Sequence, residues 1–369
     1  MSLKRNNRTG RISKIGIITW HYYGNFGSAL QSFALQEKIS QLGYDVEFVN
    51  YRNPKFGRPS YFKKTVRIII GSTLGLFNNR FIFGQPKFSH KYLREGRCAM
   101  DSYQLSRVTE KYDALVCGSD QIWAPNVFNP IYFAEFAKEG IRKISYAASI
   151  GLNEIPDILV ETYRKLLSDF YVVSIREEEG QKLLKERCGI EAKVVIDPTL
   201  LYDSKFYEKI QRKVPNINGK YLFCYFLNEN HQYRNRVEKY AKMHDLQIIG
   251  VSSNKEDKVW MKMLERLGAD HFIWLINHAE AVMTDSYHGT IFSLLFHKNF
   301  WVFVRFEENN PICQNSRIRQ LQTYFGLQGH VLDTKDSIFE NQIIDYSLID
   351  NALAKLRFSS ITFLKNALQ

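Results

Sequence analysis

The sequence predicts an α/β protein built from two Rossmann-like domains that face each other across a cleft. Three observations lead to this fold class. The chain has 369 residues, of which 45% are hydrophobic, so it can bury cores for two domains. Short apolar strands alternate with amphipathic helices along most of the chain, which is typical of parallel sheets covered by helices. A connector rich in breaker residues, VPNINGK at 214–220, separates two such series.

These series define the predicted domains. The N-terminal domain covers residues 1–200, with a basic insertion at about 52–97, and the C-terminal domain covers residues 201–345. Residues 346–369 remain, and most of them are predicted to form a long amphipathic helix. One arrangement open to this helix is to pack back on the N-terminal domain.

The N-terminal series begins with a strand over 14–20 that ends in the loop HYYGNFG. The helix predicted over 28–43 places Leu35, Ile39 and Leu42 at steps of four and three, with Gly43 as its C-terminal stop. The glycine loop lacks the GxGxxG and GK[ST] patterns, so alone it indicates only a turn. The other elements predicted here are strands at 45–51, 112–118, 142–151 and 171–177, a helix at 178–187 and a closing segment at 192–200.

The C-terminal series contains the sharpest motif, DSYHGT at 285–290. A strand is predicted over Ala281–Thr284 before the motif and a helix after it, so Asp285 or Ser286 is the expected N-cap. Either choice places His288 in the first helical turn, where free backbone N–H groups attract anions. The alternative is that His288 is a polar residue at a turn and has no functional role. The series also includes strands at 220–227, 245–252 and 301–304 and a helix near 233–244.

Composition and targeting signals favour a cytoplasmic protein. The five cysteines are scattered without a CxxC pair, which indicates a reduced protein without structural zinc. The apolar run at 15–20 is too short for a signal peptide, and no stretch approaches the roughly 20 apolar residues of a membrane span.

Most of the net charge of +12 lies in one segment. Residues 52–97 contain 11 Lys and Arg against one acidic residue, Glu95, and several aromatic residues lie among them. This pattern suits an anionic membrane at the inner face of the cell, or a nucleic-acid backbone. Since no nucleic-acid motif occurs there, we expect no nucleic-acid partner. Two alternatives stay open: a solvated insertion whose charges only aid solubility, and a non-enzymatic adaptor that docks through this segment.

The candidate site residues follow predicted strands, where ligands of parallel α/β sheets bind. They come from both series, so the two domains are expected to share one site. After the first strand come Gly24, Asn25 and Gly27; Ser119 and Asp120 follow a second strand, Arg176 a third and His288 a fourth.

Five motifs follow one another along the chain: WHYYGNFGSALQSFALQ, YDALVCGSDQIW, SIREEEG with VIDPTL, TDSYHGTIFSLLFHKNF and NSRIRQL. In this order they resemble the polysaccharide pyruvyl transferase family. The resemblance covers about 15–327, and the insertion at 52–97 departs from it. It implies a fold similar to the two-domain glycosyltransferases of the B type, and transfer of a pyruvyl group from phosphoenolpyruvate to a sugar, commonly as a cyclic ketal. It also implies a role in building surface polysaccharides such as capsule and exopolysaccharide.

The resemblance also implies roles for individual residues. Arg176 and Arg317 are expected to bind the phosphate and carboxylate of phosphoenolpyruvate. His288 is the expected general acid, and Asp120 takes the proton of the acceptor hydroxyl or orients the acceptor. No residues have metal-ligand spacing, so we expect neither a metal nor a cofactor beside the donor. The other expected substrate-binding residues are Gly24, Asn25, Gly27, Ser119, Ser286, Gly289 and Thr290.

Each of these roles has a plainer alternative. The alternative for Arg176 is that it pairs only with the acidic run 177–179. For Asp120 it is that the side chain only caps its turn, and for Arg317 that it forms an ion pair across the cleft without binding substrate. At the level of the whole protein, a glycosyltransferase of the same fold that uses a nucleotide sugar is the second hypothesis, because fold does not determine function. The acceptor itself, lipid-linked or not, is not encoded in any motif.

Overall fold

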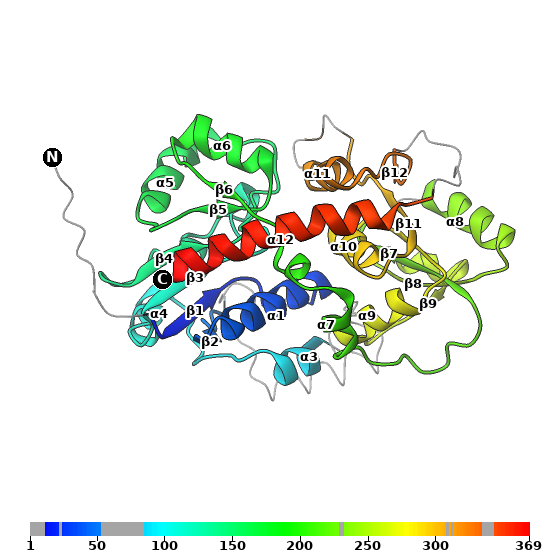
Figure 1. The fold of residues 1–369 in the computed structure, drawn as a ribbon, viewed down its shortest axis with the longest axis horizontal. Coiled ribbons are helices and arrows are strands. Elements are labelled where there is room, and N and C mark those ends of the chain that lie inside the picture. Colours follow the sequence, from blue (N-terminus) through cyan, green and yellow to red (C-terminus); the bar gives the residue numbers. More distant parts are fainter. Residues whose placement is uncertain are drawn as a thin grey trace.

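The computed structural model describes residues 12–21, 24–52, 85–228, 232–307, 310, 313–333 and 343–369. In this part of the chain two α/β units lie side by side, and a long C-terminal helix runs along both (Figure 1). Every strand pair in the sheets is parallel. The predicted α/β class with parallel sheets is therefore confirmed.

The N-terminal sheet has the strand order β2-β1-β3-β4, and a short pair, β5-β6, extends it. Isolated bridges from Ile144 to Val172 and from Ala148 to Ile175 join the pair to β4. The carboxyl ends of these strands point toward the C-terminal unit. The strands are β1 (Lys14–Ile18), β2 (Asp45–Phe48), β3 (Ala114–Cys117), β4 (Arg142–Ser145), β5 (Ser174–Ile175) and β6 (Lys193–Val194).

The C-terminal sheet has the strand order β12-β11-β10-β7-β8-β9. Its central strands are buried along nearly their whole length, as expected for a sheet covered on both faces. The strands are β7 (Tyr221–Phe226), β8 (Gln247–Ser252), β9 (Lys262–Met263), β10 (Ala281–Thr284), β11 (Asn299–Phe303) and β12 (Val331–Leu332).

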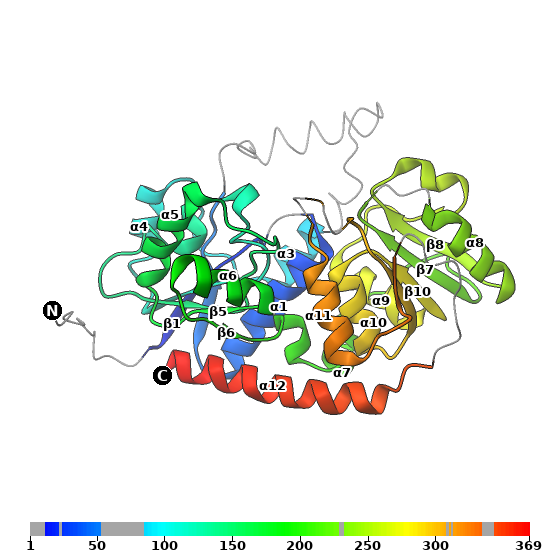
Figure 2. The same ribbon diagram turned by 90° about the horizontal axis from the view of Figure 1, so that it is seen from above.

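The helices cover the faces of the two sheets (Figure 2). Those of the N-terminal unit are α1 (Phe26–Gln41), α3 (Gln85–Tyr92), α4 (Ser102–Val108), α5 (Asp157–Ser168) and α6 (Glu178–Cys188), and α7 (Ser204–Glu208) lies in the connection. Those of the C-terminal unit are α8 (Gln232–Met243), α9 (Ala269–His278), α10 (Tyr287–Leu295), α11 (Ser316–Phe325) and α12 (Tyr346–Leu368).

Helix α1 joins the two units at its N-terminal end. It follows β1 in the N-terminal sheet, but its first residue, Phe26, stacks on Phe272 of α9 with ring centroids 5.0 Å apart. Phe26 also lies 5.7 Å from the ring of Tyr225 at the end of β7. The first turn of α1 is therefore held at the contact between the domains.

Helix α12 crosses from the C-terminal unit to the N-terminal one. At its start, the hydroxyl of Tyr346 donates to the Lys298 carbonyl beside β11. Further along, Ser360 Oγ accepts from the Ile196 N–H at 3.1 Å, and the Tyr44 hydroxyl donates to the Leu368 carbonyl at 3.0 Å. The helix thus contacts both units and reaches the chain just after β6.

Two local features differ from the sequence prediction. Helix α1 begins at Phe26, two residues earlier than predicted, because the Asn25 side chain accepts from the Gly27 N–H at 2.8 Å and caps it. Of the basic insertion, 53–84 lies outside the described residues, so the membrane prediction for that part has no structural counterpart here. Phe88, one of its aromatic residues, is 1% exposed and packs against Phe33 in the core. No helix in the described ranges has the length and apolar character needed to cross a bilayer.

Candidate functional site

His288 lies at the contact of two helix N-termini. It is the second residue of α10, whose N-cap is Ser286, as one of the two sequence alternatives predicted. Its imidazole rests against Gly27 in the first turn of α1: a Cβ built on Gly27 would lie 2.0 Å from His288 Nδ1. Since only a glycine leaves room for the ring, α1 fixes the place of His288.

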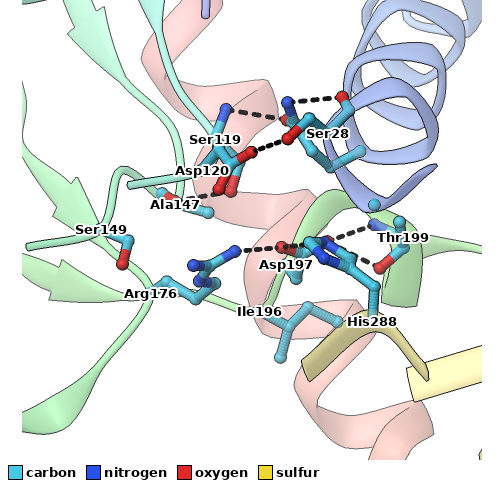
Figure 3. A network of polar contacts seen from close by, with 12 residues as sticks. Ser28, Ser119, Asp120, Ala147, Ser149, Arg176, Ile196, Asp197, Thr199 and His288 are labelled. Atoms are coloured by element: carbon cyan, nitrogen blue, oxygen red, sulfur yellow. Dashed lines mark hydrogen bonds and ion pairs between the residues drawn. The ribbon is translucent and has the colours of Figure 1, made fainter. Parts of the chain in front are cut away.

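Asp197 is the carboxylate partner of His288. It follows β6, is fully buried, and its Oδ2 lies 3.6 Å from His288 Nε2. Oδ1 accepts from the N–H and the hydroxyl of Thr199 at 2.9 and 2.6 Å (Figure 3). Burial raises the pKa of Asp197, but His288, Arg176 and Thr199 outweigh it and hold this pKa well below its usual value. The carboxylate is therefore ionised beside the imidazole.

Arg176 completes this chain of contacts. It is 2% exposed, and its Nη1 donates to Asp197 Oδ2 at 2.7 Å. Its Nε donates to Glu177 Oε1 at 3.3 Å, and the same oxygen accepts from the Ser149 hydroxyl. Nη2 has no hydrogen-bond partner among the described residues. Arg176 therefore does pair with Glu177, as the plainer alternative held, but it also binds Asp197 and keeps one buried N–H₂ group unused.

Tyr287 brings the second predicted arginine to the same place. The guanidinium carbons of Arg176 and Arg317 lie 4.6 and 5.5 Å from the centroid of the Tyr287 ring. Arg317 donates to Gln314 Oε1 at 2.8 Å. The structure shows no carboxylate within ion-pair distance of Arg317 in the described ranges, so the predicted alternative of an ion pair across the cleft is wrong there.

The two guanidiniums repel each other. Burial, and then the charge of Arg176, lowers the pKa of Arg317 to about 10, so both groups stay charged at neutral pH. Arg317 Nε is buried without a hydrogen-bond partner in the part of the chain that the structure describes. Arg176 is buried and Arg317 partly buried, and two such like charges with unused N–H groups form an arrangement that an anion would stabilise.

Asp120 belongs to the N-terminal unit and lies next to this cluster. It follows β3, is 6% exposed and has a φ of 73°. Its Oδ1 accepts from the Gln121 N–H at 2.8 Å, which is the capping role of the plainer alternative. Its Oδ2 accepts from the Ser28 hydroxyl at 2.5 Å, and Ser28 follows Gly27 in α1 (Figure 3). Asp120 and His288 thus contact two neighbouring residues, Ser28 and Gly27, in the first turn of α1.

The remaining predicted ligands are engaged mainly within the fold. Ser119 is fully buried and its hydroxyl donates to the Ala147 carbonyl at 2.7 Å. The Gly289 N–H donates to Ser286 Oγ at 3.3 Å, and the Thr290 hydroxyl donates to the Ser286 carbonyl at 3.0 Å. To donate to a bound anion instead, these groups would have to break the bonds within the fold, so their substrate role stays a prediction. Asn25 caps α1, and Gly24 is exposed at the preceding bend.

A small pocket adjoins Tyr287 and Arg317. Asp285 lines it but is not the helix cap: its carboxylate accepts from the N–H groups of Leu227 and Asn228 at 2.7 and 2.9 Å. Burial raises the pKa of Asp285 to about 6 against the opposing effect of Arg305. The lining residues are Asp285, Tyr287, Phe303, Arg305, Phe306, Gln314, Asn315, Arg317 and Ile318.

His21, beside the glycine loop, does not belong to this cluster. Its ring stacks on Phe48 with centroids 4.9 Å apart, and Nδ1 lies 3.2 Å from the Thr19 carbonyl. Burial, and then the charge of Arg52, lowers its pKa to about 3. His21 is therefore a neutral core residue, as a lone histidine often is.

Sequence reasoning missed four residues of the cluster and named a fifth, Glu177, only as an alternative partner of Arg176. Asp197 and Thr199 lie in the motif VIDPTL, and the position of an aspartate after a predicted strand was the available signal. Glu177 and Tyr287 adjoin the predicted residues Arg176 and His288, and Ser28 adjoins Gly27. The described residues contain no group of three or more His, Cys, Asp or Glu side chains placed to hold a metal ion.

The chemistry available here is anion binding next to proton transfer. Two guanidiniums offer unused donors, and an imidazole held by a carboxylate lies at the helix N-termini beside them. A second carboxylate, that of Asp120, accepts a hydrogen bond from Ser28 in the first turn of α1. This set fits a small, multiply charged donor and an acceptor that must lose a proton.

The family model of the polysaccharide pyruvyl transferases matches residues 25–305. Among solved structures, the chain is similar to the UDP-GlcNAc 2-epimerase of Neisseria meningitidis bound to UDP-GlcNAc, with 11% identity over 97% of this chain and 99% of that one and a TM-score of 0.54. It is also similar to a putative UDP-N-acetylglucosamine 2-epimerase of Listeria monocytogenes, with 10% identity, 97% and 91% coverage and a TM-score of 0.53. These likenesses show a glycosyltransferase-B-like fold. Curated protein sequences give no match.

Proposed function

Because the chain belongs to the polysaccharide pyruvyl transferase family, a family of transferases, we propose that its donor is phosphoenolpyruvate. The acceptor is a sugar of a surface polysaccharide or of its precursor, and the product is a ketal. The observation that supports this most is the pair Arg176 and Arg317, with unused buried N–H groups beside His288. Phosphoenolpyruvate carries a phosphate and a carboxylate, the two groups that guanidiniums bind best.

The reaction joins an acceptor oxygen to carbon 2 of phosphoenolpyruvate. The enol methylene gains a proton and becomes a methyl group, and phosphate leaves with the electron pair of its carbon–oxygen bond. A second hydroxyl of the acceptor then bonds to the same carbon and releases its proton, which closes the ketal. Two carbon–oxygen bonds form, one breaks, and phosphate is the only other product.

His288 delivers the proton to the methylene carbon in this scheme. Asp197 orients the imidazole in this scheme, since its ionised carboxylate lies 3.6 Å from Nε2. Asp120 accepts the proton of the attacking hydroxyl or orients the acceptor. Arg176 and Arg317 bind the donor and stabilise the phosphate as it leaves.

The purified protein is expected to bind phosphoenolpyruvate with a metal chelator present, because side chains supply the positive charge of the site. Isothermal titration calorimetry measures this binding, and UDP-, GDP- and CMP-sugars titrated in parallel represent the glycosyltransferase alternative. Binding that appears only after a divalent metal is added would contradict the expected metal independence. Binding of a nucleotide sugar without any binding of phosphoenolpyruvate would contradict the proposed donor.

The acceptor is proposed to be lipid-linked and to be met at an anionic membrane, through the charge of segment 52–97. We expect co-sedimentation with anionic liposomes that weakens as salt rises, since each lysine or arginine near such a surface contributes about 1 kcal/mol. A variant with Lys63, Lys64 and Arg67 replaced by glutamine should bind less. Equal binding of the native chain to neutral and anionic liposomes would leave the charge with a solubilising role only.

A further inference from the structure

One contact between the domains touches the donor site directly. Gln320 of α11 lies against the first turn of α6 and bonds there twice: its Nε2 donates to the Arg176 carbonyl at 3.1 Å, and its Oε1 accepts from the Glu178 N–H at 2.9 Å. The Tyr324 hydroxyl donates to Glu178 Oε1 at 2.5 Å. Figure 2 shows α11 and α6 facing each other where the two units meet. One amide side chain therefore bridges the backbone on both sides of Glu177.

The same face of α11 carries Arg317. Arg317, Gln320 and Tyr324 are spaced by three and four residues, which places them on one side of the helix. This face is the one that meets the N-terminal unit. The position of Arg317 beside Arg176 consequently depends on how α11 is held against α6.

The charge of Arg176 opposes that arrangement, whereas those of Glu177 and Asp120 favour it. Arg176 and Arg317 lie over the same Tyr287 ring and repel each other, and Arg317 has no ion-pair partner in the described ranges. Arg176 is fixed independently by Asp197 and Glu177 of its own unit. Ile318, Leu321 and Phe325 pack α11 into the hydrophobic core. The contacts that place its other face against α6 include the two hydrogen bonds of Gln320.

We propose that Gln320 is a positioning residue that holds α11 against α6 and thereby sets Arg317 next to Arg176. The donor site is then assembled from both domains, and it is complete only while this contact is made. The identity of the anion as phosphoenolpyruvate rests on the proposed function, whereas the contact itself does not.

Gln320→Met tests this proposal, because methionine keeps the length and helix propensity of the side chain and removes both hydrogen bonds. The dissociation constant for phosphoenolpyruvate is expected to rise about 10- to 30-fold, the loss of two neutral hydrogen bonds. The effect should appear in KM, with kcat changed by less than about 3-fold. Thr323→Ala is the matched control, since Thr323 is exposed on α11 and its hydroxyl bonds only within the helix, to the Arg319 carbonyl.

The second readout is hydrogen exchange of the Glu178 amide, which needs no substrate. Glu178 is the first residue of α6, so its N–H has no intrahelical acceptor and depends on Gln320 Oε1. Its exchange in Gln320→Met should be roughly 10-fold faster or more, and unchanged in Thr323→Ala.

A dissociation constant within about 2-fold of the native value in both Gln320→Met and Gln320→Ala would overturn the proposal. The alanine variant secures the test if the methionine variant folds poorly, since alanine is the best helix former. If the native protein itself binds no phosphoenolpyruvate, the proposed function fails. Hydrogen exchange of the Glu178 amide then decides whether Gln320 makes the proposed contact. Faster exchange at Glu178 in Gln320→Met would still support the contact, and unchanged exchange would reject it.

Discussion

Replacing His288 by asparagine is expected to lower kcat by about 10²–10⁴-fold, the usual contribution of a positioned acid or base. Stability should stay within about 1 kcal/mol, because asparagine keeps a polar group in the first turn of α10 and Asp197 keeps Arg176 and Thr199 as partners. Steady-state kinetics with phosphoenolpyruvate and urea unfolding measure the two effects. A fall in kcat with little change in KM would place the contribution in the transition state.

Gly27→Ala tests the position of the same imidazole by changing the residue against which it packs. The new Cβ would lie 2.0 Å from His288 Nδ1, so the ring must move. A displacement on the order of 1 Å is enough to lower turnover about 10²-fold.

His297→Asn is the control for His288→Asn, because His297 is an exposed histidine of the same domain that pairs with Asp350. If His288→Asn melted many degrees lower while turning over normally, His288 would be a structural residue.

The two arginines of the site are expected to differ in their effect on stability. Arg176→Met should cost about 3–5 kcal/mol of unfolding free energy, because it leaves Asp197 and Glu177 as buried carboxylates without their cation. Arg317→Met should change stability by no more than about 1 kcal/mol, since it removes a charge that is repelled by Arg176. Methionine preserves the apolar stem in both cases, so the comparison isolates the charge.

Both variants should bind phosphoenolpyruvate more weakly, by roughly 1.5–3 kcal/mol for each charge-assisted hydrogen bond lost. Urea unfolding gives the stabilities, and calorimetry under conditions where each variant is folded gives the affinities. Equal destabilisation by the two substitutions would contradict the view that Arg176 is held within its own domain while Arg317 is held for the ligand.

The alternation of strands and helices was enough to predict the fold class, because each parallel strand is short, apolar and followed by a helix. Periodicity located α1, α6 and α10, with ends off by a few residues where a side chain such as Asn25 caps the helix. Helix α9 escaped prediction. Its polar residues lie at its two ends, so the sequence shows only the short apolar run 272–276, which is equally consistent with a buried strand.

The candidate site was predicted only in part, for a different physical reason. A strand followed by a capped helix is a local pattern, so the place of His288 in α10 was readable from DSYHGT. Its partner Asp197 lies far earlier in the chain, and their contact depends on how the two units pack. Local pattern also could not distinguish a hydroxyl that faces a ligand from one that bonds within the fold, as those of Ser119 and Thr290 do.

Transfer of label from phosphoenolpyruvate to a glycan would reveal the proposed reaction itself. The native protein and His288→Asn are incubated with carbon-labelled phosphoenolpyruvate and lipid-linked glycans from the source organism, and the glycans are analysed by mass spectrometry. The native protein is expected to add one labelled pyruvyl group per phosphate released, and the variant to do so at about 1% of that rate or less. Labelling by the variant at the native rate, or a native protein that labels no glycan yet transfers sugar from a nucleotide donor, would contradict it.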